Sequence, residues 1–211
     1  MGLFTPFWKL DSPYSKKAQS VYQKIDALTD QSLLEKIAIE APLAEVRERA
    51  VKKIVNQIII SKVILEDKNF DVRFRAIHRS SDLELLKKIV VTDKSYSHGG
   101  GHRYTLAAAA WSVLVSNNAL DEAFLERLAL DESIEVTIRS DAIEQLSNQS
   151  LLEKLASDNS PVVSNSAISR LKVLGISYGS NTDMPDKEQK SEDLSGYKAP
   201  FTEDVDNGKY W

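Results

Sequence analysis

Apolar residues recur along the chain in short phrases with a helical spacing. The clearest phrases are 29–38 and 45–54, and each would form one apolar stripe on a helix. The first stripe comprises Leu33, Leu34, Ile37 and Ala38, and the second comprises Val46, Ala50, Val51 and Ile54. The pattern predicts two short amphipathic helices in succession.

The two phrases recur in order, so the body of the chain is an internal repeat. The aliphatic anchors of the first phrase lie 26, 26, 39 and 27 residues apart, at Leu34, Ile60, Leu86, Leu125 and Leu152. The second phrase places one alanine in four copies, at Ala50, Ala76, Ala142 and Ala167. The period is 26 residues, and the third copy carries an insertion of about a dozen residues.

Capping residues mark the ends of the expected helices. Side-chain oxygens that could accept free N–H groups precede the apolar stripes at Asp30, Ser81 or Asp82, Asp121 and Asn148. Pro42 and Pro161 fall between helices. A lead-in helix is expected to start near Ser12 and Pro13. Because no long stretch alternates with a period of two, we expect no sheet.

Two short helices cannot bury their own stripes, so the copies must stack on one another. We expect an all-α fold, a right-handed α-solenoid of about five two-helix repeats. The predicted organisation is an N-terminal cap and lead-in helix (1–28), a repeat domain (29–175) and a disordered acidic tail (176–211). The tail has eight acidic residues against four lysines and lacks a helical or strand period.

One motif in the second phrase resembles a known repeat family. An acidic residue, Val, Arg, two variable residues, Ala and an aliphatic residue follow one another at 45–51 and at 71–77. On these motifs, residues 29–172 resemble HEAT-type repeats, and the short period is also similar to that of leucine-rich variant repeats. The resemblance implies a scaffold or adaptor, although some such proteins bind nucleic acid or modify other proteins. The metal cluster that some leucine-rich variant relatives hold on cysteines is not implied here, because the chain has no cysteine.

Composition excludes several classes of chemistry. The 211 residues include 27 basic and 31 acidic ones, for a net charge of −4, which argues against a strongly basic nucleic-acid binder. Without cysteine there is no disulfide, thiolate metal site or cysteine nucleophile. No apolar run of 18 residues and no secretory signal is present, so we expect a cytoplasmic protein, and a monomer.

Arg47, Arg73 and Arg139 occupy the same place in three copies, with Ser164 at that place in the fourth. A row of guanidinium groups could bind phosphate or an acidic peptide. The interpretation that we favour is structural: the resemblance to HEAT-type repeats implies that each arginine pairs with an acidic residue of a neighbouring copy and caps loop carbonyls. Glu45 and Asp71, two residues upstream of their arginines, suit that pairing.

The insertion at 94–105 is the strongest irregularity of the repeat. His98 and His102 flank three glycines, beside Tyr96, Arg103 and Tyr104. The two histidines could share a metal only with a third ligand, such as Asp93 or His78, and the spacing fixes none. We predict instead a mobile loop that contacts a partner, with no metal and no cofactor.

Two apolar features and one basic cluster remain. The N-terminal 2–10 segment could contact a membrane, but the favoured interpretation is that Leu3, Phe4, Phe7 and Trp8 cover the first repeat. Trp111 is expected in the core, with its N–H on a loop carbonyl. The basic residues of the second helices could form a positive patch together with Lys87 and Lys88. These second-helix residues are Arg49, Lys52, Lys53, Arg75 and Arg79.

The predicted function is a non-catalytic scaffold that binds a protein or peptide. Its expected surface is the second-helix face with the insertion, through Tyr96, His98, His102, Arg103, Tyr104, Arg75 and Arg79. One alternative is a nucleic-acid-binding protein that uses the basic cluster, against which the neutral body and acidic tail count. Another is a chromophore lyase or modifying enzyme, for which Asp93 with His98 or His102 is the only candidate pair.

Overall fold

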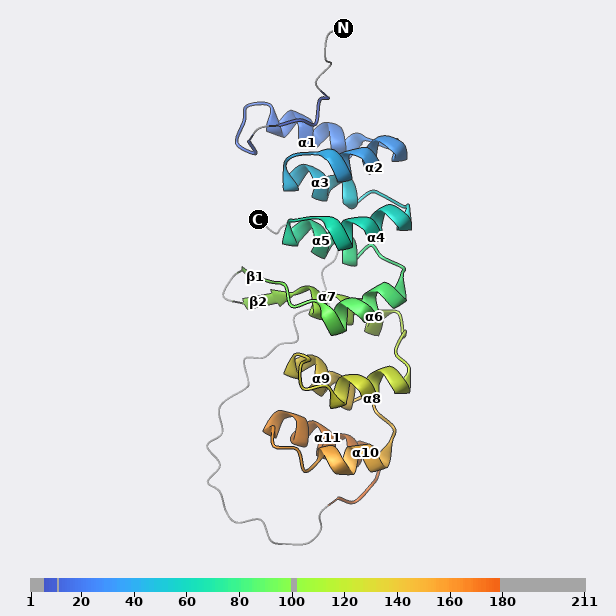
Figure 1. Cartoon of the computed structure of the whole chain (residues 1–211). Helices are drawn as coiled ribbons and strands as arrows, with labels where there is room; N and C mark the ends of the chain where they lie inside the picture. Colours follow the sequence, from blue (N-terminus) through green and yellow to red (C-terminus); the bar gives the residue numbers. More distant parts are fainter. Residues whose placement is uncertain (1–5, 11, 100–101, 179–211) are drawn as a thin grey trace. The chain divides into compact units, whose positions relative to one another are not determined.

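The computed structural model describes residues 6–10, 12–99 and 102–178. This part of the chain forms eleven helices and one β-hairpin (Figure 1). The elements are α1 (Ala18–Ala27), α2 (Gln31–Glu40), α3 (Ala44–Val51), α4 (Gln57–Glu66), α5 (Phe70–Ile77), α6 (Leu83–Thr92), β1 (Tyr96–Gly99), β2 (His102–Thr105), α7 (Leu106–Ser116), α8 (Glu122–Leu130), α9 (Val136–Ile143), α10 (Gln149–Leu155) and α11 (Pro161–Val173). The expected helical class is confirmed. None of the described helices is long and apolar enough to cross a bilayer.

After α1, the helices pack as five successive pairs, numbered here one to five from α2–α3 to α10–α11. Figure 1 shows the pairs following one another in chain order, with the hairpin inserted inside pair three. The second helices also touch across pairs: α1 on α3, α3 on α5, α5 on α7, and α9 on α11. Backbone contact between α7 and α9 is sparser, so the junction between pairs three and four differs from its neighbours.

The repeated positions form the core. The aliphatic anchors of the first helices are buried in all five pairs: Leu34, Ile60, Leu86, Leu125 and Leu152. The alanines of the second helices are completely buried: Ala50, Ala76, Ala142 and Ala167. A methyl side chain at the crossing point lets two helices approach closely, so the alanine spacing sets where the helices touch.

Four predicted helix caps are confirmed. The carboxylates of Asp30, Asp82 and Asp121 accept the backbone N–H three residues on, at 3.1, 3.0 and 2.8 Å. Asn148 caps α10 in the same way, at 3.1 Å from the nitrogen of Leu151. The lead-in helix was placed too early, because α1 begins at Ala18 and Lys17 provides no side-chain cap.

The expectation that the chain has no sheet is wrong. β1 and β2 pair antiparallel, with Tyr96 opposite Thr105 and His98 opposite Arg103. The two strands are only four residues each, so they leave no long alternating pattern. A usable signal was present: two four-residue segments separated by Gly100 and Gly101, a typical hairpin sequence.

In the part that is described, the N-terminal segment packs against the core, and the Lys24 ammonium of α1 lies 5.8 Å from the centre of the Phe7 ring. Trp8 and Leu10 are buried, and Phe7 packs partly buried against the core. The rings of Phe7 and Trp8 meet edge to face, with centroids 5.4 Å apart. Leu3 and Phe4 lie outside the described residues, as does the predicted tail from residue 179 onward.

Candidate interaction site at the hairpin and the second-helix face

The hairpin is anchored at its base on the preceding pair. Asp93, which ends α6, forms an ion pair with Arg73 of α5. Arg73 also donates to the hydroxyl of Ser95 at 3.3 Å. The second carboxylate oxygen of Asp93 accepts the Ser95 N–H at 2.7 Å, which fixes the turn that leads into β1.

The following pair holds the other side of the same base. The Lys94 ammonium donates to the carbonyl of Ser133 at 2.7 Å. Buried Thr105 donates its hydroxyl to Glu135 at 3.1 Å and accepts the Ala108 N–H at 3.0 Å as the cap of α7. Because contacts reach it from both neighbouring pairs, the base of the hairpin is held in one position.

Above this base, aromatic side chains face solvent. Tyr96 is 54% exposed, and its ring meets the exposed His98 ring edge to face at 5.2 Å. Tyr104 is half-buried, and the strand pairing places it opposite Ser97. The pairing sets His98 opposite Arg103 and Gly99 opposite His102. Five of the predicted contact residues, Tyr96, His98, His102, Arg103 and Tyr104, therefore belong to one hairpin.

His78 belongs to a different cluster, at the C-terminal end of α5, where it is the capping residue. Its ring packs edge to face on Phe74 at 4.7 Å, and Phe74 stacks on Phe70 at 6.1 Å. Burial, and to a lesser extent the charge of Arg75, lower the pKa of His78 below its ordinary value. Among the described residues, no three His, Asp or Glu side chains are grouped closely enough to hold a metal ion.

The basic residues of the second helices are engaged within the chain. Arg75 pairs with Glu48 at 3.3 Å, and Arg79 donates to the carbonyl of Ile54 at 3.1 Å, so both predicted contact residues bridge to the preceding pair. Lys52 also pairs with Glu48, at 3.1 Å. The other members behave alike: Arg49 pairs with Asp26 at 2.7 Å, and Lys53 donates to the carbonyls of Ile25 and Asp26. The second-helix members of the expected positive patch therefore have partners within the chain, although Lys53 and Arg79 donate to carbonyls and keep their charge.

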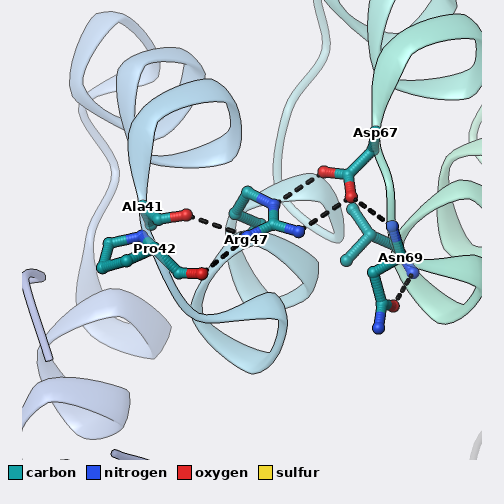
Figure 2. Close-up of polar contacts among 6 residues, drawn as sticks. Ala41, Pro42, Arg47, Asp67 and Asn69 are labelled. Atoms are coloured by element: carbon teal, nitrogen blue, oxygen red, sulfur yellow. Dashed lines mark hydrogen bonds and ion pairs between the residues drawn. The ribbon is translucent and has the colours of Figure 1, made fainter. Parts of the chain in front are cut away.

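The arginine ladder joins each pair to the next. Arg47 donates to both carboxylate oxygens of Asp67, at 2.6 and 2.8 Å, and to the carbonyls of Ala41 and Pro42 (Figure 2). Asp67 in turn accepts the Asn69 N–H at 2.9 Å. The structural interpretation is confirmed here, but the partner is Asp67 of the next pair and not Glu45.

Arg73 and Arg139 make related contacts, which differ in detail from those of Arg47. Arg73 donates to the Ile64 carbonyl at 2.9 Å and pairs with Asp93, not with the expected Asp71. Arg139 donates to the Ala129 carbonyl at 3.1 Å, but its nearest approach to Asp158 is 3.8 Å. A cavity of 390 Å³ lies beside this loosened pair, lined by Leu130, Glu132, Arg139, Lys154, Leu155, Ser157, Asp158 and Asn159.

Sequence reasoning missed the aspartates of the ladder, although they carry a signal. Asp67, Asp93, Asp131 and Asp158 each follow a first helix, and each accepts the N–H two residues on. The residue that supplies this N–H is always Asn or Ser, so an Asp-x-Asn/Ser motif recurs at the end of four first helices. The motif predicts the turn, and at Asp67 and Asp93 the turn positions the carboxylate for the arginine.

Trp111 is buried as predicted, but its hydrogen-bond partner differs. The indole N–H donates to a carboxylate oxygen of Asp141 at 3.1 Å, and not to a loop carbonyl. Asp141 is exposed as a whole residue, yet desolvation of its carboxyl group raises its pKa, against a smaller lowering by the indole. The contact joins α7 to α9, where backbone contact is sparse.

Comparison with protein-family models, with curated proteins and with solved structures found no match. What the chain does is therefore inferred from its own geometry.

Proposed function

We propose that the chain is a non-catalytic scaffold, a right-handed α-solenoid of about five two-helix repeats that binds a protein or peptide. The resemblance to HEAT-type repeats and the recurring contacts between successive pairs support this architecture. In the proposal, the chain works without a cofactor, as a cytoplasmic monomer.

A single observation carries the proposed role: the hairpin has a fixed base and an exposed aromatic surface. Contacts from Arg73, Lys94 and Thr105 hold the base, while Tyr96 and His98 face solvent. Rigid aromatic side chains lose little conformational entropy on binding and are enriched in protein interfaces. We therefore assign the contact surface to the hairpin, with Arg75 and Arg79 on the second helix of pair two as its neighbours in the proposal.

The alternative of a nucleic-acid-binding face gains nothing from the geometry. Polyanion binding needs cations that release counterions when phosphate arrives. The candidate cations on the second helices already have carboxylate or carbonyl partners, such as Glu48 for Arg75 and Asp26 for Arg49.

The test is affinity capture from the native cell with the full chain as bait. A Tyr96→Ser/His98→Ser variant removes the exposed rings and keeps the side chains of Arg73, Asp93, Lys94 and Thr105 that hold the base. Tyr14→Ser is the matched control, because Tyr14 is 95% exposed and lies outside the hairpin. We expect one stoichiometric protein to be retained by the wild type and the control and lost by the hairpin variant. Equal retention by all three forms, or no partner for any of them, would overturn the assignment.

A further inference from the structure

The first helices carry a row of cations at one repeated position. Each cation lies two residues after the buried anchor of its helix, and the row comprises Lys36, Lys62, Lys88, Arg127 and Lys154. All five residues are exposed. Their separations of 26, 26, 39 and 27 residues equal those of the anchors, so each of the five pairs contributes one cation.

These cations are far less engaged than those on the second helices. Lys62 lies 3.9 Å from Glu66, and the Arg127 guanidinium lies 5.1 Å from the centre of the Phe124 ring. Lys36, Lys88 and Lys154 have no ion pair within 4.0 Å among the described residues. An exposed ammonium without a partner can pair with an incoming carboxylate without first breaking a contact.

An aliphatic row runs beside the cations. Three residues after each cation stands Ile39, Leu65, Val91 or Leu130, and Ser157 in the last pair. Ile39, Leu65 and Leu130 are 39%, 57% and 49% exposed. Residues three apart are neighbours on a helix surface. The first helix of each of pairs one to four therefore presents one cation next to one aliphatic side chain.

Acidic residues directly after the aliphatic row reduce the positive charge of this surface. Glu40 and Glu66 are exposed, whereas the carboxylates of Asp131 and Asp158 are held by N–H groups of their own turns. At the corresponding place in pair three stands Thr92. The positive charge is therefore least compensated at Lys88, in the middle of the row.

We propose that this first-helix surface binds an extended peptide that alternates carboxylate and aliphatic side chains. Successive first helices make few backbone contacts with one another, so their cations are spaced more widely than on directly packed helices. A peptide in which a carboxylate recurs at every third residue has one within about 5 Å of any point along its extended length, so it can meet each cation without a matched register. Single-stranded nucleic acid fits less well, because bases need aromatic or planar partners to stack on and the neighbouring row is aliphatic.

This inference goes beyond the proposed function, which uses the second-helix face and the hairpin. The two can fail separately, because Tyr96→Ser/His98→Ser leaves the first-helix surface unchanged.

The test is fluorescence anisotropy of the full chain with a labelled synthetic peptide, five repeats of Glu-Leu-Ser, at low salt. Lys62→Glu/Lys88→Glu reverses two cations in the middle of the row. Lys16→Glu/Lys172→Glu is the matched control, with the same change of net charge at exposed lysines outside the row. A peptide of five Lys-Leu-Ser repeats and a 15-nucleotide oligo-dT are the other probes, and circular dichroism verifies that both variants fold.

We expect the acidic peptide to bind and the row variant to bind it about tenfold more weakly, because two favourable charge contacts become unfavourable. The control variant should keep wild-type affinity, and the basic peptide should not bind. Absence of binding by the acidic peptide would overturn the proposal, as would equal weakening in both variants. Tighter binding of oligo-dT than of the acidic peptide would replace it with a phosphate-binding surface.

Discussion

The junction between pairs one and two and the junction between pairs three and four solve the same packing problem with different contacts. At the first, Arg47 reaches back to the carbonyls of its own pair and forward to both oxygens of Asp67. At the second, the place of the ladder arginine is taken by Ala107, which stands three residues before the buried Ala110. Asp131, which follows the first helix of pair four, therefore has no ladder arginine opposite it. The arginine ladder is therefore interrupted once, in the pair that contains the hairpin.

Other polar contacts bridge the interrupted junction. Lys87 pairs with Asp121 at 2.7 Å, and this hydrogen bond raises the pKa of Lys87 and lowers that of Asp121. Lys94, Thr105 and Trp111 reach forward to the next pair as described above. Each of these contacts is a single hydrogen bond to an acceptor on an exposed residue, so we infer that this junction is the weakest in the stack.

The largest expected effect comes from removing a complete ladder contact. Arg47→Ala should lower the free energy of unfolding by about 3 kcal/mol, because it leaves a largely buried carboxylate without its partner. The side chains of Arg47 and Asp67 are 13% and 7% exposed, which is why this pair should matter more than a surface pair. Urea unfolding of the full chain measures the loss.

Arg49→Ala is the matched control for this prediction. Arg49 and Asp26 form an ion pair of similar length, but their side chains are 36% and 53% exposed. The control should cost less than about 1 kcal/mol. Equal losses in the two variants would show that burial of the ladder contributes nothing.

A smaller effect is expected at the interrupted junction from Trp111→Phe. The substitution keeps an aromatic ring in the core and removes the N–H that Asp141 accepts. We expect a loss of about 1.5 kcal/mol, most of it from the charge-assisted hydrogen bond. Comparison with Asp141→Ala and the double variant in a mutant cycle isolates this contact, and strictly additive losses would mean that the bond contributes nothing.

The contact made by Lys94 should matter less still. Its ammonium is exposed and donates only to the Ser133 carbonyl. Lys94→Ala is expected to cost about 0.5 kcal/mol in a urea titration. A loss as large as that of Arg47→Ala would show that Lys94 replaces the missing arginine in full.

The smallest expected effect depends on pH. Desolvation raises the pKa of Asp141 in the folded chain, so its ionisation destabilises the fold. This loss of stability is complete at pH values above the raised pKa of the folded chain. It disappears as the pH falls through that pKa toward 3.8, the pKa of the unfolded chain. Asp141→Asn should therefore be slightly more stable than the wild type at pH 7, by less than about 0.5 kcal/mol because the residue is exposed.

Thermal unfolding at several pH values measures this difference, which should shrink as the solution becomes acidic. Glu144→Gln removes a charge from the exposed end of the same helix and serves as the control. A stability difference for Asp141→Asn that grows at low pH would contradict the assignment.

The sequence predicted features that depend on neighbours within a few residues. The caps at Asp30 and Asp121 and the buried alanines follow from local spacing, and they are where the repeat pattern places them. The role of Arg47 was also predictable, because the structural interpretation already placed its acidic partner in a neighbouring copy.

The identity of that partner could not be predicted from the repeat alone. Asp67 lies 20 residues after Arg47, and only the stacking of one pair on the next brings the two together. The hairpin was missed for a different reason, because strands of four residues leave too little alternation to detect. The sequence named the residues of the candidate site, because they are neighbours along the chain. It did not predict the contacts that fix Asp93 and Thr105 at the base, because their partners come from other pairs.

Hydrogen exchange of the full chain, followed by mass spectrometry in mild urea, tests the weakness of the interrupted junction most directly. The missing ladder contact predicts that α8 to α11 lose protection together while α2 to α6 remain protected, with the step falling between α7 and α8. A gradual decline from both ends of the stack, or a step at a junction where Arg47 or Arg73 makes its ladder contact, would contradict it.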